Sequence, residues 1–177
     1  MAFGKPINEE LLVDFIKRCL ALLQDSNVVV GGGVALSVYT EPRLTQDLDL
    51  FLLPENLVSV EKALLGGGFV KTVVYDFKSS KIHKFKSGDR VLDILVFDDN
   101  ELNKFLFSSP KVGTVFGIET KVLSIEGLII SKLISWRPKD KIDLESLFEV
   151  DNIDFTVIKN WVNKLGISFG LSRFKTV

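Results

Sequence analysis

Cysteine is almost absent from this sequence, and its scarcity limits the chemistry open to the protein. Cys19 is the only cysteine, so no disulfide can form within the chain, and with one histidine there is no soft-metal cluster to suggest zinc. Cys19 lies in the apolar-periodic segment 11–23, where we interpret it as a small core residue. A reducing, intracellular compartment fits this composition best.

An excess of charge of either sign is also missing. The 22 basic and 23 acidic residues give a net charge of −1, which argues against a broadly basic nucleic-acid binder. No run reaches the roughly 18 apolar residues that a membrane span needs, and the first ten residues lack the layout of a signal peptide. We therefore expect a cytoplasmic protein with no membrane partner.

The apolar pattern predicts a mixed β-sheet flanked by helices, in the α/β (α+β) class. The 177 residues, 46% of them hydrophobic, suffice for one core, so a single domain over 1–177 is expected. We divide it into an α/β core over about 1–123 and a short helical C-terminal segment over about 124–177. Helices are predicted at 8–24, 34–39, 55–65, 124–136, 139–148 and 155–165, and strands at 28–30, 48–53, 69–77, 81–86, 90–97 and in a hairpin over 111–122. A polar stretch without a predicted element follows residue 100.

Two glycine triplets differ in their context. Gly31–Gly33 follows the apolar strand Val28–Val30 and precedes a helix, where backbone amides can approach an anion closely. Gly66–Gly68 follows a predicted helix and precedes a strand, so we interpret it as a helix terminator without a ligand. Only the first triplet is a candidate anion site.

Two carboxylates follow the first triplet on a predicted strand. Asp47 and Asp49 are two residues apart, so their side chains point to the same face and can share one cation or two. The alternative is a strand with one ordinary polar face. Against that alternative, the strand continues as the apolar run Leu50–Leu53, as expected of a strand covered on both faces.

Asp93 is a lone acid inside the apolar run Val91–Val96. Its burial would cost several kcal/mol unless the carboxylate were paired, protonated or metal-bound. A structural salt bridge is the main alternative to a functional role. Together with Asp47, Asp49 and the glycine turn, however, Asp93 suggests metal-dependent phosphate chemistry, and hard carboxylate oxygens suit one or two magnesium ions.

Three further residues could touch phosphate. Lys132 falls on the apolar stripe of its predicted helix, so its ammonium must extend to water or to an anion such as a triphosphate. Arg43 and Thr45, just before the acid pair, would either contact phosphate or fix their loop by hydrogen bonds.

Other polar residues have simpler interpretations. The charges at Arg137, Lys139, Asp140 and Asp143 are expected to be helix-terminal charges next to Pro138. His83 lies between lysines on a predicted strand and is expected to be half-exposed, with no nucleophile to pair with it.

In combination, these segments resemble the minimal nucleotidyltransferases of the DNA polymerase beta superfamily. The resemblance is carried by Gly32–Ala35, Arg43–Leu50 and Leu92–Ile94, and it is nearest to the Abi-type (AbiEii-like) toxin and related bacterial nucleotidyltransferase-like proteins. The helical segment Glu126–Lys132 with Arg137–Leu144 also looks like that group. The resemblance extends over most of the chain, about 28–147, and implies a nucleotidyltransferase fold.

The resemblance also implies roles for individual residues. Asp47 and Asp49 would bind divalent metal, magnesium or else manganese, and Asp93 would complete the site and activate the attacking hydroxyl. The phosphates of a nucleoside triphosphate such as ATP would be held by Gly32 and Gly33 and neutralised by Lys132.

The function implied is transfer of a nucleoside monophosphate to a hydroxyl of an RNA, a protein or a small molecule. The protein would then be a candidate toxin of a toxin–antitoxin system, with an antitoxin as partner. One alternative is a catalytically silent nucleotide-binding or protein-interaction module. A weaker one is an antibiotic-modifying nucleotidyltransferase, for which the acidic stretch Glu149–Asp154 is faint support.

Overall fold

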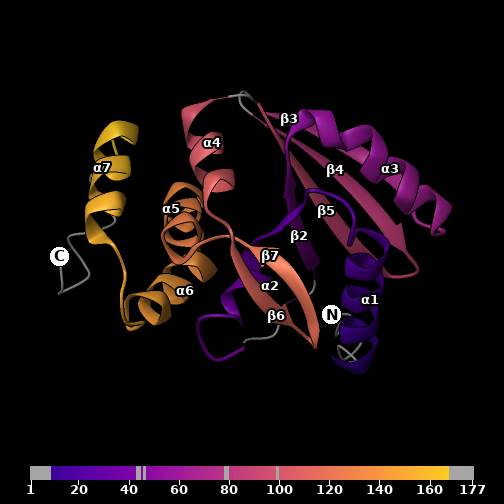
Figure 1. Cartoon of the computed structure of the whole chain (residues 1–177), viewed down its shortest axis with the longest axis horizontal. Helices are drawn as coiled ribbons and strands as arrows, with labels where there is room; N and C mark the ends of the chain where they lie inside the picture. The colour runs from indigo at the N-terminus through magenta and orange to yellow at the C-terminus, as the bar shows by residue number, and fades with distance from the viewer. Residues whose placement is uncertain (1–8, 43–44, 46, 78–79, 99, 168–177) are drawn as a thin grey trace, which may run out of the picture.

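A mixed sheet organises the computed structural model of the chain, which describes residues 9–42, 45, 47–77, 80–98 and 100–167 (Figure 1). Its order is β3-β4-β5-β2-β1-β7-β6. Only β2–β5 and β1–β7 pair in parallel, and the other neighbours are antiparallel. The strands are β1 (Val29–Val30), β2 (Asp47–Leu52), β3 (Val70–Phe77), β4 (Ser80–Ser87), β5 (Arg90–Phe97), β6 (Lys111–Val115) and β7 (Ile118–Val122).

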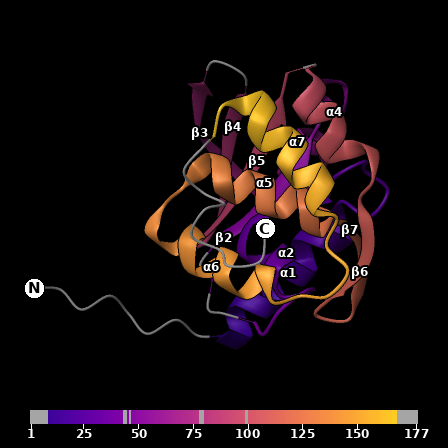
Figure 2. The same cartoon turned by 90° about the vertical axis from the view of Figure 1, so that its left-hand side faces the viewer.

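Helices cover both sides of this sheet. In Figure 1, α1 and α3 lie on one side of β2–β5, and α4 and α5 lie on the other, with α6 and α7 farther out. Figure 2 shows α7 in front of α5, on the same outer side. The helices are α1 (Glu9–Leu22), α2 (Gly32–Leu36), α3 (Leu57–Gly66), α4 (Glu101–Ser108), α5 (Ile125–Ser135), α6 (Pro138–Phe148) and α7 (Phe155–Leu165), and a 3-10 turn, η1 (Pro54–Asn56), precedes α3.

The predicted fold class, a mixed sheet flanked by helices, is confirmed. Each predicted strand corresponds to an observed one, and the hairpin predicted near Ser87–Asp89 joins β4 to β5, with Ser87 opposite Arg90. The second glycine triplet ends α3, as predicted, with Gly67 as the C-cap and Gly68 at φ +82°. Across the described segments, no helix has the length and apolar character needed to cross a membrane.

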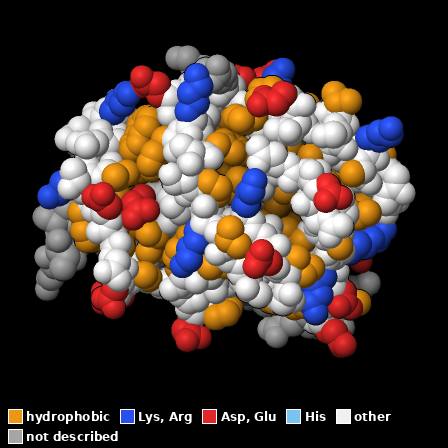
Figure 3. Space-filling view, in the orientation of Figure 1, with side chains coloured by type: hydrophobic (Ala, Val, Ile, Leu, Met, Phe, Trp, Pro, Cys, Tyr) orange, Lys and Arg blue, Asp and Glu red, His pale blue; other side chains and the backbone are white. Residues whose placement is uncertain are grey.

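One helix was missed: the stretch after Asn100 is α4, not an irregular polar segment. The Asn100 side chain caps this helix by accepting a hydrogen bond from the Asn103 N–H at 2.9 Å. Its apolar residues pack inward, and Phe105 contacts Trp161 of α7 with ring centroids 5.2 Å apart. Hydrophobic side chains are visible at the surface between α4 and α7 in Figure 3. Asn100 thus marks the start of a helix.

Strand β2 is the element that connects the core to the site. Leu48, Leu50 and Leu52 are fully buried on one of its faces. Asp47 and Asp49 lie on the other, because side chains alternate along a strand. The interpretation of Cys19 as a core residue is also confirmed, since it is fully buried and burial raises its pKa to about 12.

Candidate active site

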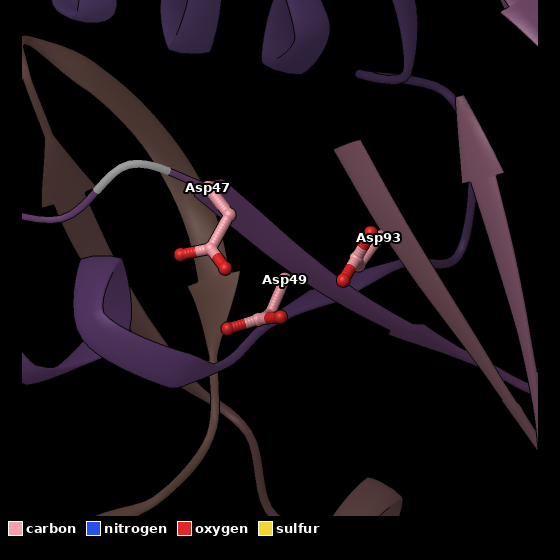
Figure 4. A group of neighbouring side chains, drawn as sticks. All are labelled: Asp47, Asp49 and Asp93. Carbon is pink, nitrogen blue, oxygen red and sulfur yellow. The ribbon is translucent and has the colours of Figure 1, made fainter. Parts of the chain in front are cut away.

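Three carboxylates meet where β2 and β5 lie side by side. The parallel pairing of these strands puts Asp49 directly opposite Asp93. Asp47 lies two residues before Asp49 on β2, on the same face of the sheet (Figure 4). One oxygen from each carboxylate lies within 4.8 Å of the others. The structure therefore brings together the three acids that the sequence singled out, in a geometry that could hold a metal ion.

The charges of this acidic cluster, Asp47, Asp49 and Asp93, disfavour one another. Burial and, to a smaller extent, the neighbouring charges of Asp47 and Asp93 raise the pKa of Asp49 to about 6, although Lys139 and Arg137 act in the opposite direction. A divalent cation between the three groups would relieve both the repulsion and the desolvation. Clusters of this kind, with perturbed pKa values, are characteristic of functional sites.

The first glycine triplet packs directly against these acids. Gly32 has φ +57°, and a Cβ atom there would overlap the Asp49 carboxylate. At Gly31, a Cβ would lie 2.7 Å from the ring of Phe51, and the Gly31 N–H donates to the Asp49 carbonyl at 2.9 Å. Glycine is thus required here by space and by backbone conformation. Helix α2 begins at Gly32, two residues before the predicted start, so the triplet itself forms its first turn.

Asp93 has a protein cation as its partner. Lys84 Nζ lies 2.7 Å from Asp93 Oδ1 and 2.6 Å from Oδ2, so the structural ion pair considered for this lone acid is present. Sequence reasoning did not name Lys84, although a signal existed. The predicted β4–β5 hairpin, continued from Ser87 opposite Arg90, puts Lys84 directly opposite Asp93.

Of the two loop residues predicted to fix the loop or to contact phosphate, Thr45 can be placed. Its hydroxyl donates to Asp47 Oδ1 at 3.1 Å and lies 3.3 Å from the Asp47 carbonyl. Thr45 therefore orients Asp47, as expected of a residue that fixes the loop. Arg43 lies outside the described residues.

Lys132, predicted to neutralise a triphosphate, is buried among carboxylates of α6. Its ammonium lies 2.5 Å from Asp143 Oδ2 and 3.7 Å from Asp140 Oδ1, and the side chain is only 4% exposed. The anion that this lysine meets is thus part of the protein, and a contact with phosphate stays a prediction. Asp140 and Asp143, expected to be ordinary helix-terminal charges, are instead buried, because this lysine pairs with them.

This buried network reaches the acidic cluster through Arg137. Asp140 accepts hydrogen bonds from the Arg137 Nε at 2.7 Å and from its backbone N–H at 3.0 Å. The bond to Asp140 raises the pKa of Arg137 most, and the charges of Asp49 and Asp47 raise it further. Arg137 and Lys139 are therefore the cations at the start of α6 that act on the acidic cluster. The sequence pattern did not reveal this role, because both residues were expected to be ordinary helix-terminal charges.

His83 is buried, which corrects the expectation of a half-exposed residue. Its Nδ1 lies 2.9 Å from Glu61 Oε1 of α3, which also pairs with Lys71 at 2.6 Å. His83 is next to Lys84 on β4 and so points to the opposite face of the sheet, away from the acidic cluster. The histidine therefore lies outside the acidic cluster.

Known structures share this fold. The chain resembles the solution structure of the antibiotic-resistance factor ANT(2'')-Ia with a TM-score of 0.69 at 17% identity, covering 93% of this chain and 94% of that one. A crystal structure of ANT(2'')-Ia with adenylyl-2''-tobramycin gives 0.59 at 17% identity, over 94% and 98%. A Thermotoga maritima protein assigned provisionally as a nucleotidyltransferase gives 0.58, also at 17%, over 91% and 98%.

No family model and no curated protein matches the sequence. The nucleotidyltransferase fold is thus established by the structural likeness alone.

Proposed function

We propose that the protein is a metal-dependent nucleotidyltransferase. In the proposed reaction, an acceptor hydroxyl attacks the α-phosphorus of a nucleoside triphosphate, pyrophosphate leaves, and the hydroxyl proton passes to a base. The observation that carries the proposal is the convergence of Asp47, Asp49 and Asp93, whose oxygens lie within 4.8 Å of one another on a nucleotidyltransferase fold.

The donor set fits a hard divalent cation. Three carboxylates from adjacent strands offer only oxygen ligands, which magnesium and manganese prefer. Asp47, Asp49 and Asp93 would hold one or two such ions. When bound, the metal would offset phosphate charge and stabilise the entering and leaving oxygens.

The remaining roles belong to the chain itself. Thr45 orients Asp47 through its hydrogen bond, and Lys84 forms an ion pair with Asp93 with which a bound metal would compete. Asp93 would accept the proton of the attacking hydroxyl. The absence of a side chain at Gly32 leaves room beside Asp49, so that the backbone of Gly32 and Gly33 can approach the phosphates.

Positive charge for the triphosphate would come from the start of α6. Arg137 and Lys139 already act on Asp49 electrostatically, and the Arg137 side chain is 58% exposed, so it can reach a ligand. Lys132 would act indirectly, by holding Asp140 and Asp143 and through them the start of α6.

A second candidate is modification of an antibiotic. It is favoured by the likeness to ANT(2'')-Ia, a resistance factor that has been crystallised with adenylyl-2''-tobramycin. One residue of the acidic stretch expected to support it, Asp154, has a structural role, because its carboxylate caps α7 by accepting from the N–H groups of Thr156 and Val157. A toxin role with an antitoxin partner has the sequence resemblance as its support.

The decisive experiment is a transfer assay with defined acceptors. The purified protein is incubated with each α-labelled nucleoside triphosphate, magnesium, and in separate reactions total RNA, cell-extract protein or tobramycin. Label transferred by the wild type and lost in Asp47→Asn/Asp49→Asn supports the proposal and identifies the acceptor class. Asp89→Asn, in the exposed β4–β5 turn, is the matched control and should retain activity.

Absence of transfer to every acceptor would contradict the proposed activity. If nucleotide binding were retained in that case, the chain would be a silent nucleotide-binding module. Chelation of the divalent metal should abolish transfer by the active protein, because the carboxylates would again repel the triphosphate.

A further inference from the structure

Strand β3 forms one edge of the sheet, and nothing in the described chain pairs with its outer side. It comes first in the strand order, and in Figure 2 it lies at the rim of the sheet. All eight of its residues are exposed. Five of them are large and apolar, between 38% and 63% exposed: Val70, Val73, Val74, Tyr75 and Phe77. A long apolar edge of this kind is a template for pairing with another strand.

The side chains of β3 divide cleanly between the two faces of the sheet. Its pairing with β4 shifts between Lys71 and Val73, so Thr72 is the extra residue of a β-bulge. Lys71, Val74 and Asp76 lie opposite Phe85, His83 and Lys81, all on one face. The remaining four apolar residues of β3 lie on the other face, opposite Lys86, Lys84, Ile82 and Ser80.

We propose that β3 pairs antiparallel with β3 of a second copy of this chain, about a two-fold axis at Val74. With Thr72 bulged, this axis puts Val74 opposite the partner's Val74, and Val73 opposite the partner's Tyr75. The outer positions then pair Val70 with the partner's Phe77. Every one of these pairs joins residues on the same face, as an antiparallel sheet requires.

Charge fixes the register of this pairing. Within one chain, Lys71 pairs with Glu61 and Asp76 with the exposed Lys81. The same axis also puts Lys71 opposite the partner's Asp76, and symmetry produces this pair twice. Moving the axis by one position, to Val73 or Tyr75, removes both pairs and sets charged side chains against apolar ones. Opposite charges directly across two strands stabilise their pairing, and like charges oppose it. The strand is thus complementary to itself in one register.

This inference is independent of the proposed function, since it uses no residue of the acidic cluster. Backbone hydrogen bonds would supply much of the affinity, as in other strand-addition contacts. The contact is small, so a weak, concentration-dependent dimer is expected. Because the axis is perpendicular to the sheet, the two acidic clusters would open on the same face of one continuous sheet.

The first test is sedimentation of the full chain over a wide concentration range. We expect the mass to rise from one chain to two, and Val74→Lys to shift the dissociation constant at least tenfold by placing two like charges at the axis. Val58→Lys, at a more exposed site on α3, is the matched control and should dimerise normally. A wild type that stays monomeric, or a Val74→Lys variant that dimerises as well as the wild type, would overturn the proposal.

A second test uses the two charge pairs. Asp76→Lys alone and Lys71→Asp alone each put like charges opposite one another, so each variant should be monomeric. Mixed together, one chain supplies two cations and the other two anions, so a heterodimer should form. Circular dichroism of each variant excludes unfolding as the cause. Failure of the mixture to associate, with both variants folded and the wild type dimeric, would place the interface elsewhere.

Discussion

Two clusters of charge lie close together in this protein and are built in opposite ways. The acidic cluster holds three carboxylates with one close protein cation, Lys84, and burial with mutual repulsion raises the pKa of Asp49. The other cluster, between α5 and α6, pairs Lys132 with Asp143 and Asp140, and Asp140 with Arg137. Buried charges that are matched by partners are tolerated in a fold, whereas a cluster left with excess charge is prepared for a ligand.

The largest effect is expected from breaking the matched cluster. Lys132→Met leaves the carboxylates of Asp143 and Asp140 without their buried ammonium, so the free energy of unfolding should fall by about 3–5 kcal/mol. Denaturant unfolding measures this loss. Lys132→Met combined with Asp143→Leu removes both charges of the closest pair and should recover much of the stability. If the double variant is as unstable as the single one, the pair is not what holds α5 to α6.

A glycine substitution compares the acidic cluster with an ordinary helix end. Gly32→Ala puts a Cβ against the Asp49 carboxylate at φ +57°, so we expect a loss of about 2–4 kcal/mol and weaker metal binding. The control is Gly66→Ala at the end of α3, where a Cβ meets nothing within 4 Å and should be neutral or slightly stabilising. Thermal unfolding compares the two variants. If the two variants unfold at the same temperature, the acidic cluster does not require glycine at position 32.

Removing a charge from the acidic cluster should raise the free energy of unfolding, whereas the two substitutions above lower it. Since the pKa of Asp49 is raised to about 6, the folded protein binds a proton more tightly than the unfolded chain, and stability falls as pH rises from about 4 to 6. Asp49→Asn should therefore be more stable than the wild type by about 1–3 kcal/mol at pH 7.5, with the difference vanishing below about pH 4. Denaturant unfolding across this pH range checks both statements. At saturating manganese, the wild type should instead be the more stable of the two, because it keeps all three carboxylates for the metal.

Lys84→Met should have the smallest effect on stability. Without metal, we expect a loss of about 1–2 kcal/mol, because buried Asp93 loses its partner while water still screens the partly exposed Lys84 end of the pair. The variant should bind manganese about 3- to 10-fold more tightly, since a competing positive charge is gone. Calorimetric titration with manganese measures this, with Lys86→Met, an exposed neighbour on β4, as control. Weaker binding in Lys84→Met would mean that Lys84 supports the metal ligands rather than competing with the metal.

Local sequence patterns predicted the parts of the site that lie close together along the chain. Alternation placed Asp47 and Asp49 on one face of β2, and the cost of burying Asp93 alone indicated a partner or a ligand. The same reasoning failed for Lys132, because a lysine on an apolar stripe has the same pattern whether it reaches water, phosphate or a buried carboxylate. It also undervalued Arg137, whose influence on the acids depends on where α6 packs.

The sequence by itself determined the strands, the helices other than α4, the glycine turn and the pair of acids that follows it, since these depend on side-chain periodicity and on backbone conformations available to glycine. Only the tertiary structure decided that Asp93 lies opposite Asp49, that Lys84 binds Asp93 and that Lys132 is buried between two helices. Parallel pairing of β2 with β5 and the docking of α6 on α5 join residues far apart along the chain. No local pattern encodes such contacts, because they arise from how the whole core packs.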